Sequence, residues 1–341
     1  MPAVSKVPTR AFGKLGPELP RLGLGLMNTS GTYNLPPPDS ERLALLDHAY
    51  NKGQVFWDTA DEYGDSEDLL GKWFAANPEK RKDIFLATKF GIRIIDGKLQ
   101  PSSSPEYCRQ AIEKSLKRLG LPYIDLYYIH RLDKVTPIEK TIEALVQLKN
   151  EGKIKHLGIS ECSAESLRRA HAVHPITAIQ VEYSLFCREI ESSKTKLLET
   201  ARELGVAVVC YSPLGNGFLT GRFRTVEDVS GPGDRRHILP WYAPDYLANN
   251  LAVVDKIAEI AKTKGITSAQ LALAWLLAQG NDIFPIPGTS NFKRLDENLA
   301  SASVTITEEE EKALRELAGE IVAERFQSKT GFAYGDTPPL E

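Results

Sequence analysis

Short apolar runs alternate with amphipathic stretches along most of this chain. The runs are rich in β-branched and aromatic side chains, a pattern that is typical of strands buried on both faces of a parallel sheet. A polar turn follows each run, and apolar residues then recur at the spacing of a helix that covers one face of a sheet. The chain repeats this strand–helix unit eight times, which predicts a closed (β/α)8 barrel of the α/β class rather than an open sheet.

The bounds of the predicted elements follow from where the runs begin and end. We expect barrel strands at 22–26, 54–58, 84–89, 124–130, 154–160, 178–183, 206–211 and 283–286. We expect barrel helices at 40–52, 66–76, 104–118, 137–150, 164–173, 192–204, 248–264 and 293–301, with an extra helix at 268–278.

Three further features lie outside the repeated units. Segment 10–20 contains two glycines and predicts a hairpin that covers the barrel floor. Thr307 and Glu310 form a capping box for a C-terminal helix. Segment 222–250, after the seventh strand, is too long for a tight turn, and loops of that length are usually functional.

Composition and charge exclude several classes of protein. With 42% hydrophobic residues the chain can bury a sizeable core, and its net charge of −3 provides no general field for nucleic acid or an anionic membrane. No segment approaches a membrane span, and the N-terminus lacks the apolar stretch of a secretion signal. The four cysteines are scattered without a CxxC pair, so we expect reduced thiols. We therefore expect a cytoplasmic protein that binds a small molecule, without nucleic acid or membrane partners, while a homo-oligomer stays open.

Four polar residues, Asp58, Tyr63, Lys89 and His130, lie at or just after the ends of three predicted strands. Neighbouring parallel strands end at the same rim, so these side chains are expected to converge there. A tyrosine with its usual pKa of about 10 is a poor proton donor unless a cation lies nearby, and Lys89 would lower that pKa. Asp58 would keep the ammonium charged, and His130 would orient a substrate oxygen. Each residue alone is consistent with ordinary packing, whereas their convergence predicts a proton-delivering site.

A metal site is not expected. His171 and His174 share a helix end, but no third ligand accompanies them, and the chain contains no HExxH motif. A nucleotide-binding Rossmann unit is also not indicated, because Gly23-Leu24-Gly25 is not followed by a helix.

The segments around the four residues resemble the aldo-keto reductases. FWDTADEYGDSEDLLG is similar to a signature of that superfamily, and Lys89 in ATKFG and His130 in YYIHRLD fall where it keeps its Lys and His. GKIKHLGISECSAESL, IQVEYSLF, YSPLGNGFLTGRF and PIPGTSNFKRLDENL follow in family order. The chain looks most like the fungal and plant branches with pyridoxal reductases and auxin-induced-type reductases. The resemblance implies a single barrel domain over 1–341, with the barrel at about 21–302 and a C-terminal helix and tail at 303–341.

The resemblance also implies the cofactor and its contacts. The family reduces carbonyl groups with NADPH, and by position Tyr63 would be the general acid of a tetrad with Asp58, Lys89 and His130. Ser160 and Gln180 would bind the nicotinamide carboxamide, and Tyr211 would stack on the nicotinamide ring. The other positions implied to contact the cofactor are Asp58, Ser212, Leu214, Gly215, Arg222, Ser290, Arg294, Glu297 and Asn298.

Two physical arguments bear on these positions. A helix that starts near Gly288 to Lys293 would present free backbone N–H groups to a phosphate, and the Arg294 guanidinium suits a 2′-phosphate. Many members of the family have Asn directly after the serine of GxS, whereas this chain has Glu161. A carboxylate there would place a negative charge close to the nicotinamide, so we assign Glu161 no role.

The sequence leaves more than one substrate and more than one class of function open. Aryl aldehydes or pyridoxal are the expected substrates by family analogy, and the side chains expected to form the pocket wall are Met27, Tyr33, Trp57, Arg131, Phe218 and Trp241. One alternative is a Schiff-base aldolase with Lys89 as nucleophile, although a lysine paired with Asp58 would stay protonated. The other is a non-catalytic module that senses NADP(H).

Overall fold

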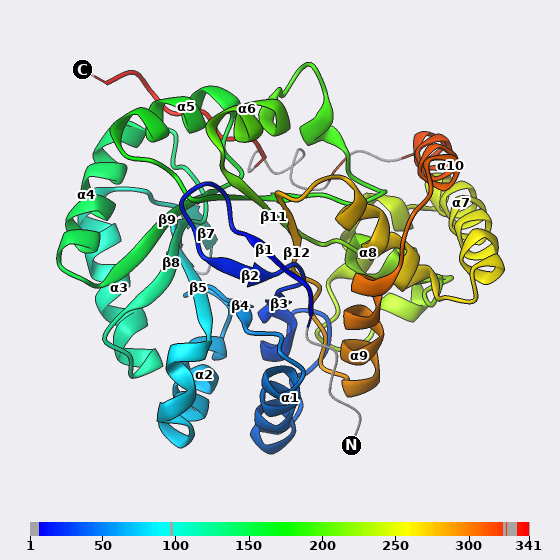
Figure 1. The fold of residues 1–341 in the computed structure, drawn as a ribbon, viewed down its shortest axis with the longest axis horizontal. Coiled ribbons are helices and arrows are strands. Elements are labelled where there is room, and N and C mark those ends of the chain that lie inside the picture. Colours follow the sequence, from blue (N-terminus) through cyan, green and yellow to red (C-terminus); the bar gives the residue numbers. More distant parts are fainter. Residues whose placement is uncertain (1–6, 96–97, 323–324, 326–332, 341) are drawn as a thin grey trace.

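The structure is a computed structural model that describes residues 7–95, 98–322, 325 and 333–340 (Figure 1). Its centre is a sheet of eight parallel strands in the order β12-β11-β10-β9-β8-β5-β4-β3. The two edges of this sheet meet, because the Gly23 backbone N–H donates to the Pro285 carbonyl at 3.0 Å and Gly25 bridges Gly288. The predicted (β/α)8 barrel is therefore confirmed.

The elements lie close to their predicted bounds. The barrel strands are β3 (Leu24–Gly25), β4 (Phe56–Asp58), β5 (Phe85–Phe90), β8 (Ile124–Ile129), β9 (Ile154–Ser160), β10 (Ala178–Glu182), β11 (Ala207–Tyr211) and β12 (Ile283–Pro285). The helices are α1 (Asp39–Asn51), α2 (Ser66–Ala76), α3 (Pro105–Leu119), α4 (Ile138–Asn150), α5 (Ala164–Val173), α6 (Leu197–Leu204), α7 (Pro244–Thr263), α8 (Ser268–Ala278), α9 (Phe292–Ala300) and α10 (Glu308–Gly319). The predicted capping box of Thr307 and Glu310 begins α10.

The barrel interior is filled by alternate residues of the strands, since successive side chains of a strand point to opposite faces. Phe56, Phe85 and Phe284 form an aromatic cluster there, and Phe12 packs against all three with ring centroids 4.9–5.4 Å apart. Phe12 belongs to the predicted N-terminal hairpin, which pairs β1 (Thr9–Ala11) with β2 (Glu18–Pro20). The hairpin crosses in front of the barrel strands in Figure 1 and closes one end of the barrel.

A second apolar layer lies between the strands and the surrounding helices. Trp57 is fully buried in it, with its ring 4.7 Å from that of Trp73 and its Nε1–H donating to the Gln54 carbonyl. Trp57 therefore belongs to the core, and its prediction as a pocket wall was wrong. The reason is the alternation along β4, which turns Phe56 and Asp58 inward and Trp57 outward.

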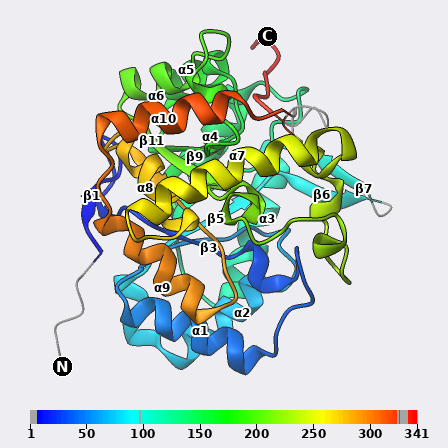
Figure 2. The same cartoon turned by 90° about the vertical axis from the view of Figure 1, so that its right-hand side faces the viewer.

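Three local features differ from the sequence-based predictions. A second hairpin, β6 (Ile92–Ile95) with β7 (Lys98–Pro101), follows β5 and was not predicted. Figure 2 shows it at the end of the barrel opposite to β1, on the rim where the strands end. Helix α6 begins five residues later than predicted, because residues 189–191 form a 3-10 turn and Lys196 adopts a left-handed conformation.

The long loop after β11 is shorter than predicted, because α7 begins at Pro244. The 3-10 segments of the described chain are Met27–Ser30, Pro78–Asp83, Glu189–Glu191, Gly215–Thr220, Glu227–Val229, Arg236–Ile238, Pro240–Tyr242 and Ser301–Ser303.

Phe218 and Trp241 pack into a small core of the loop after β11, together with Tyr242 and Val254. These two aromatic residues therefore stabilise the loop, which contradicts their prediction as pocket walls.

The four cysteines are all buried and none is in a disulfide, as predicted. Among the described residues, no helix is both long enough and apolar enough to cross a membrane.

Candidate active site

The alternation that fills the barrel also places polar groups at its rim. Lys89 follows Phe85 and Ala87 on the inward side of β5, and Asp58 follows Phe56 on that of β4. His130 directly follows β8, two residues after the inward Tyr128. The inward positions at the ends of β4 and β5 and directly after β8 thus carry polar side chains above an apolar barrel interior.

The structure brings the four predicted residues together. The Lys89 ammonium donates to the Asp58 carboxylate at 2.6 Å and to the Thr59 carbonyl at 2.6 Å. It also lies 3.5 Å from the Tyr63 hydroxyl. The Tyr63 and His130 rings meet edge to face with centroids 5.7 Å apart. An ammonium, a phenol and an imidazole therefore share one small volume at the rim.

Burial is the largest influence on the pKa values of Asp58, Lys89 and His130. It raises the pKa of Asp58 and lowers that of Lys89, and the ion pair between them opposes both shifts. Burial also lowers the pKa of His130 well below its usual value, with Arg131 and Lys89 adding to the effect, so the imidazole is neutral. A neutral imidazole can donate a hydrogen bond from one ring nitrogen.

The pKa of Tyr63 contradicts one prediction. Burial raises it well above its usual value, and the nearby Glu62 and Asp58 raise it further. We expected the Lys89 ammonium to lower this pKa, but the loss of solvation dominates, and Arg131 is the nearby cation that opposes it. The phenol therefore carries its proton at neutral pH, as a proton donor must.

Two predicted cofactor residues lie beside the tetrad. Gln180 donates from Nε2 to the second oxygen of Asp58 at 2.7 Å, which completes the hydrogen bonding of that carboxylate. Ser160 accepts at 3.1 Å from Arg131, whose guanidinium also donates to the His130 carbonyl. Arg131 thus links His130 to Ser160, a role that its prediction as a pocket wall did not include.

The turn after β11 has an unusual backbone. Ser212 and Asn216 have positive φ angles of 48° and 55°, and Gly215 and Gly217 lie beside them with 55° and 93°. Left-handed conformations are costly for residues other than glycine and tend to persist at ligand sites. Successive turns of this kind also present backbone N–H groups that bind anions.

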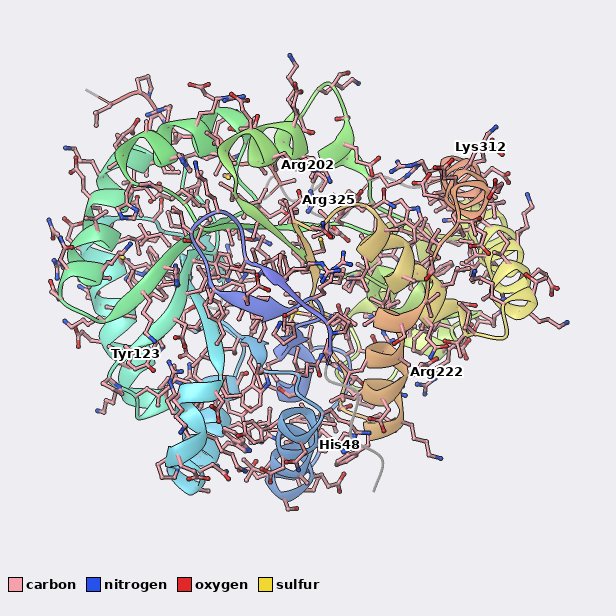
Figure 3. All side chains as sticks on the ribbon, viewed as in Figure 1. His48, Tyr123, Arg202, Arg222, Lys312 and Arg325 are labelled. Carbon is pink, nitrogen blue, oxygen red and sulfur yellow. The ribbon has the colours of Figure 1, made fainter. Side chains whose placement is uncertain are left out.

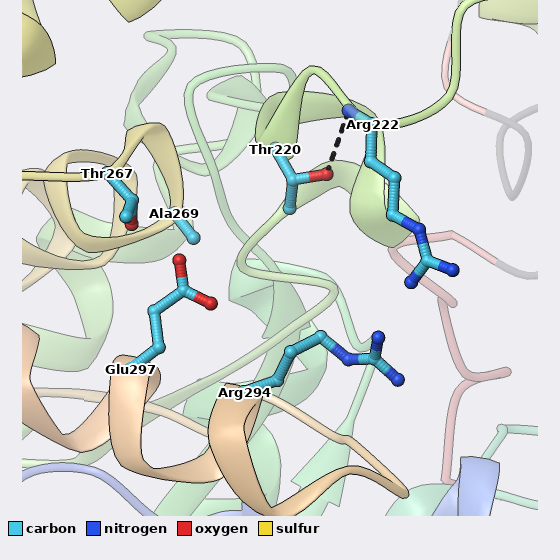
Figure 4. Close-up of a pocket in the computed structure, with 6 residues that line it drawn as sticks. All are labelled: Thr220, Arg222, Thr267, Ala269, Arg294 and Glu297. Carbon is cyan, nitrogen blue, oxygen red and sulfur yellow. Dashed lines mark hydrogen bonds between the residues drawn. The ribbon is translucent and has the colours of Figure 1, made fainter.

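A cavity of about 390 Å³ opens beside this turn (Figure 4). Its lining residues are Thr220, Arg222, Thr267, Ala269, Arg294 and Glu297. Burial lowers the pKa of Arg294, and the charge of Arg222 lowers it further, so the two guanidinium groups lie close enough to repel each other. Among the described residues neither guanidinium forms an ion pair; Arg294 donates from Nε to the Thr289 hydroxyl at 3.3 Å, and the charge of Glu297 opposes part of the repulsion. An anionic ligand such as a phosphate would relieve this repulsion, so the cavity fits a phosphorylated ligand.

The other predicted cofactor residues flank these features. Leu214 and Gly215 belong to the turn after β11, and Tyr211 ends that strand. Ser290 precedes the N-cap of α9, and Asn298 is buried on that helix. These residues therefore lie at the end of β11, on the turn after it and on or next to α9.

A buried carboxyl near the tetrad predicts how stability depends on pH. Burial raises the pKa of Asp61 to about 7, and Glu67 and Glu62 contribute. A carboxyl whose folded pKa exceeds its unfolded value stabilises the fold at low pH and loses that contribution as pH rises through about 7. We expect the free energy of unfolding to fall by about 2–3 kcal/mol between about pH 5 and 8, and Asp61→Asn to remove most of this fall. Chemical denaturation at several pH values measures it, and an equal fall in the variant would contradict it.

Comparison with known proteins agrees with this geometry. Residues 21–318 match the Aldo/keto reductase family. The chain is 46% identical to the aldo-keto reductase str7 of Strobilurus tenacellus over 339 residues, which cover 98% of this chain and 99% of that protein. It is 42% identical to the aldo-keto reductase yakc [NADP(+)] of Schizosaccharomyces pombe over 341 residues, covering 98% and 99%. A solved structure of the thermostable aldo-keto reductase Tm1743 with the inhibitor epalrestat superposes with a TM-score of 0.71 at 30% identity, covering 91% of this chain and 99% of that one.

The chain therefore belongs to the aldo/keto reductase family. Members of this family reduce carbonyl groups with NADPH, which confirms the predicted oxidoreductase class and the predicted cofactor. The unpaired guanidinium groups at the cavity fit this cofactor, because its 2′-phosphate is the anion that such a pair would bind.

Proposed function

We propose that the protein reduces aldehydes and ketones to alcohols, with Tyr63 as the general acid and His130 orienting the carbonyl oxygen. The observation that carries the proposal is the Tyr63 hydroxyl lying 3.5 Å from the buried Lys89 ammonium, beside a neutral imidazole. When bound, NADPH supplies the hydride. Tyr63 and His130 place their donors where negative charge develops on the oxygen, and such groups act strongly in a site that excludes water.

Lys89 stabilises the phenolate that remains after proton transfer. Its ammonium is held by Asp58 and by the Thr59 carbonyl, so it keeps its position while the charge on Tyr63 changes. Gln180 supports this arrangement through the other oxygen of Asp58. Proton transfer leaves one more negative charge at Tyr63, and the Lys89 ammonium 3.5 Å away offsets part of it.

The cofactor would lie along the line of residues from the tetrad to α9. The residues that would hold it are Asp58, Ser160, Gln180, Tyr211, Ser212, Leu214, Gly215, Arg222, Ser290, Arg294, Glu297 and Asn298. Two observations support this placement of the cofactor: the left-handed turn after β11 and the cavity with two unpaired guanidinium groups.

Aryl aldehydes and pyridoxal-like aldehydes are the substrates we propose first, on the resemblance to reductases of these compounds. The test is oxidation of NADPH by the purified protein with benzaldehydes, pyridoxal and a simple aliphatic ketone, repeated with NADH. Turnover of a flat aromatic aldehyde with NADPH is the expected result. Turnover of the ketone alone would remove the aromatic preference, and a preference for NADH would contradict the phosphate site.

Arg294→Gln tests the phosphate site directly. Removing a charge-assisted hydrogen bond costs about 1.5–3 kcal/mol, so we expect the dissociation constant of NADPH to rise by about 10–100-fold. Binding of NADH should change little, because NADH lacks the 2′-phosphate. Arg168→Gln removes an arginine that pairs with Glu203 on the surface and serves as the matched control. Equal losses for NADPH and NADH would place Arg294 elsewhere on the cofactor.

Two other functions make different predictions. An aldolase would form a Schiff base on Lys89 that borohydride traps, but the ion pair with Asp58 keeps that nitrogen protonated. A sensing module would bind NADPH tightly and turn over none of the aldehydes. Oxidation of NADPH without a trapped adduct excludes both.

A further inference from the structure

Arg325 forms a buried ion network at the rim, near the middle of the molecule (Figure 3). Its guanidinium donates from Nη2 to Glu161 at 2.5 Å and from Nε to Glu182 at 2.7 Å. These three side chains are between 0 and 3% exposed. Arg325 lies after α10, so a residue from the C-terminal part of the chain supplies the cation for two carboxylates of the barrel.

The C-terminal part of the chain also contacts the backbone of Glu161. Gly335 donates its N–H to the Glu161 carbonyl at 2.6 Å and accepts from the Ser163 N–H at 3.0 Å. Glu161 itself has a left-handed backbone with φ of 56°. The side chain and the backbone of one strained residue are therefore both held by residues beyond 320.

This network reaches residues that we assign to the nicotinamide. The Tyr211 hydroxyl donates to Glu161 at 3.0 Å and accepts from Arg325 at 2.9 Å. Glu161 directly follows Ser160. Its second oxygen is buried and has no hydrogen-bond partner among the described residues. The charge of Glu161 thus stands at the nicotinamide end of the proposed cofactor site.

We propose that Arg325 is a positioning residue that sets the charge at the nicotinamide end of the site, and thereby the relative affinity for NADP+ and NADPH. This inference rests on the proposed function, because it uses the placement of the cofactor given there. It assigns a regulatory role to the pairing of Glu161 with a residue near the C-terminus.

The physical reason is the charge difference between the two forms of the cofactor. The oxidised nicotinamide ring carries a positive charge and the reduced ring carries none. A lone carboxylate beside the ring would favour the oxidised form, and charges interact strongly where water is excluded. Arg325 cancels most of that effect by pairing with Glu161. Burial opposes the charge of Arg325, but Tyr211 and Glu161 raise its pKa, so the guanidinium stays charged.

Other charged groups nearby do not replace Arg325. Glu182 shares the same guanidinium, and burial raises its pKa. Glu189 lies 3.9 Å from Nη1 but is 43% exposed, so water screens its charge. Arg131 contacts Ser160 and His130 rather than Glu161. The pairing of Arg325 with Glu161 therefore controls the net charge at the nicotinamide end of the site.

The test measures dissociation constants of NADP+ and NADPH by fluorescence titration for the wild type and five variants. Arg325→Gln should lower the ratio of the NADP+ constant to the NADPH constant by about tenfold, a usual size for such coupling. Glu161→Gln should raise the ratio by a similar factor, and the double variant should return near the wild-type ratio. Arg325→Lys keeps the charge and should also stay near it. A tenfold change in this ratio corresponds to about 30 mV in the two-electron potential of the bound cofactor.

The fifth variant separates charge from docking of the C-terminal residues. Arg169→Gln removes an arginine that holds the carbonyls of Thr337 and Pro338 but lies outside the buried network. It should leave the ratio unchanged. An equal shift in Arg169→Gln would show that docking, not charge, is responsible and would overturn the inference.

The remaining outcomes are also decisive. If Arg325→Gln does not fold, the ratio measured for Glu161→Gln alone tests the inference, because this substitution removes a charge and keeps the shape of the side chain. An unchanged ratio in the folded variants of both residues overturns the inference. Failure of the wild type to bind either nucleotide would instead contradict the proposed function.

Discussion

Replacing Tyr63 with phenylalanine is expected to lower kcat by about 10²–10⁴-fold, the usual contribution of a general acid. The variant removes one oxygen atom and keeps the ring that packs against His130. Because the phenol pKa is raised by burial, Tyr63 holds its proton throughout the neutral range, and its loss removes the donor at every pH in that range. Steady-state kinetics with a reactive aldehyde measures the effect.

The control for this variant is a half-buried tyrosine outside the tetrad. Tyr107 donates its hydroxyl to the Ile92 carbonyl at 3.2 Å, so Tyr107→Phe removes a similar hydroxyl group without touching the tetrad. Both variants should bind NADPH like the wild type. Turnover by Tyr63→Phe within a few-fold of Tyr107→Phe would remove Tyr63 from the role of proton donor.

Lys89→Met is expected to be the most destabilising of the tetrad variants. It leaves the Asp58 carboxylate buried without its cation, and breaking a buried ion pair in this way costs about 3–5 kcal/mol. The double variant with Asp58→Asn removes both charges and should recover much of the loss. Chemical denaturation measures the free energy of unfolding of each variant.

The pH dependence of Lys89→Met has a definite sign. Burial raises the pKa of Asp58, and without Lys89 only the hydrogen bond from Gln180 opposes that shift, so the loss of stability should shrink as the pH falls through the raised pKa. Lys256→Met is the matched control, because Lys256 forms an exposed ion pair with Glu320 and such pairs contribute little. A loss in the free energy of unfolding as small as that of Lys256→Met would mean that Lys89 does not neutralise Asp58.

Much of the barrel could be predicted because its strands and helices obey simple periods. Helices α2, α5 and α8 and strand β9 have the predicted bounds. The same period of two explains why Asp58 and Lys89 were found, since both end apolar runs on the inward side. It also explains the error at Trp57, which lies one position away from Asp58 and points to the opposite face.

The parts that were missed depend on pairing between distant segments or on weaker signals. The contact of Glu161 with Arg325 joins residues 164 positions apart, and no local pattern marks either as a partner. Helix α7 begins at Pro244, and a proline at the first helical position was a signal that could have given its true start. The hairpin β6–β7 could also have been found, because an Asp-Gly pair separates its two strands in the sequence.

The packing of Phe12 into the closed end of the barrel has a consequence for folding of the chain during synthesis. Phe12 packs against Phe284 of the last barrel strand, and Arg10 hydrogen-bonds Asn281, a partner 271 positions later. Part of the surface of Phe12 therefore stays uncovered until the last barrel strand has been synthesised, although Phe56 and Phe85 are available earlier. Contacts of such high contact order slow folding and leave apolar surface open to aggregation. We therefore expect the yield of active protein in cells to depend on chaperones that protect nascent chains.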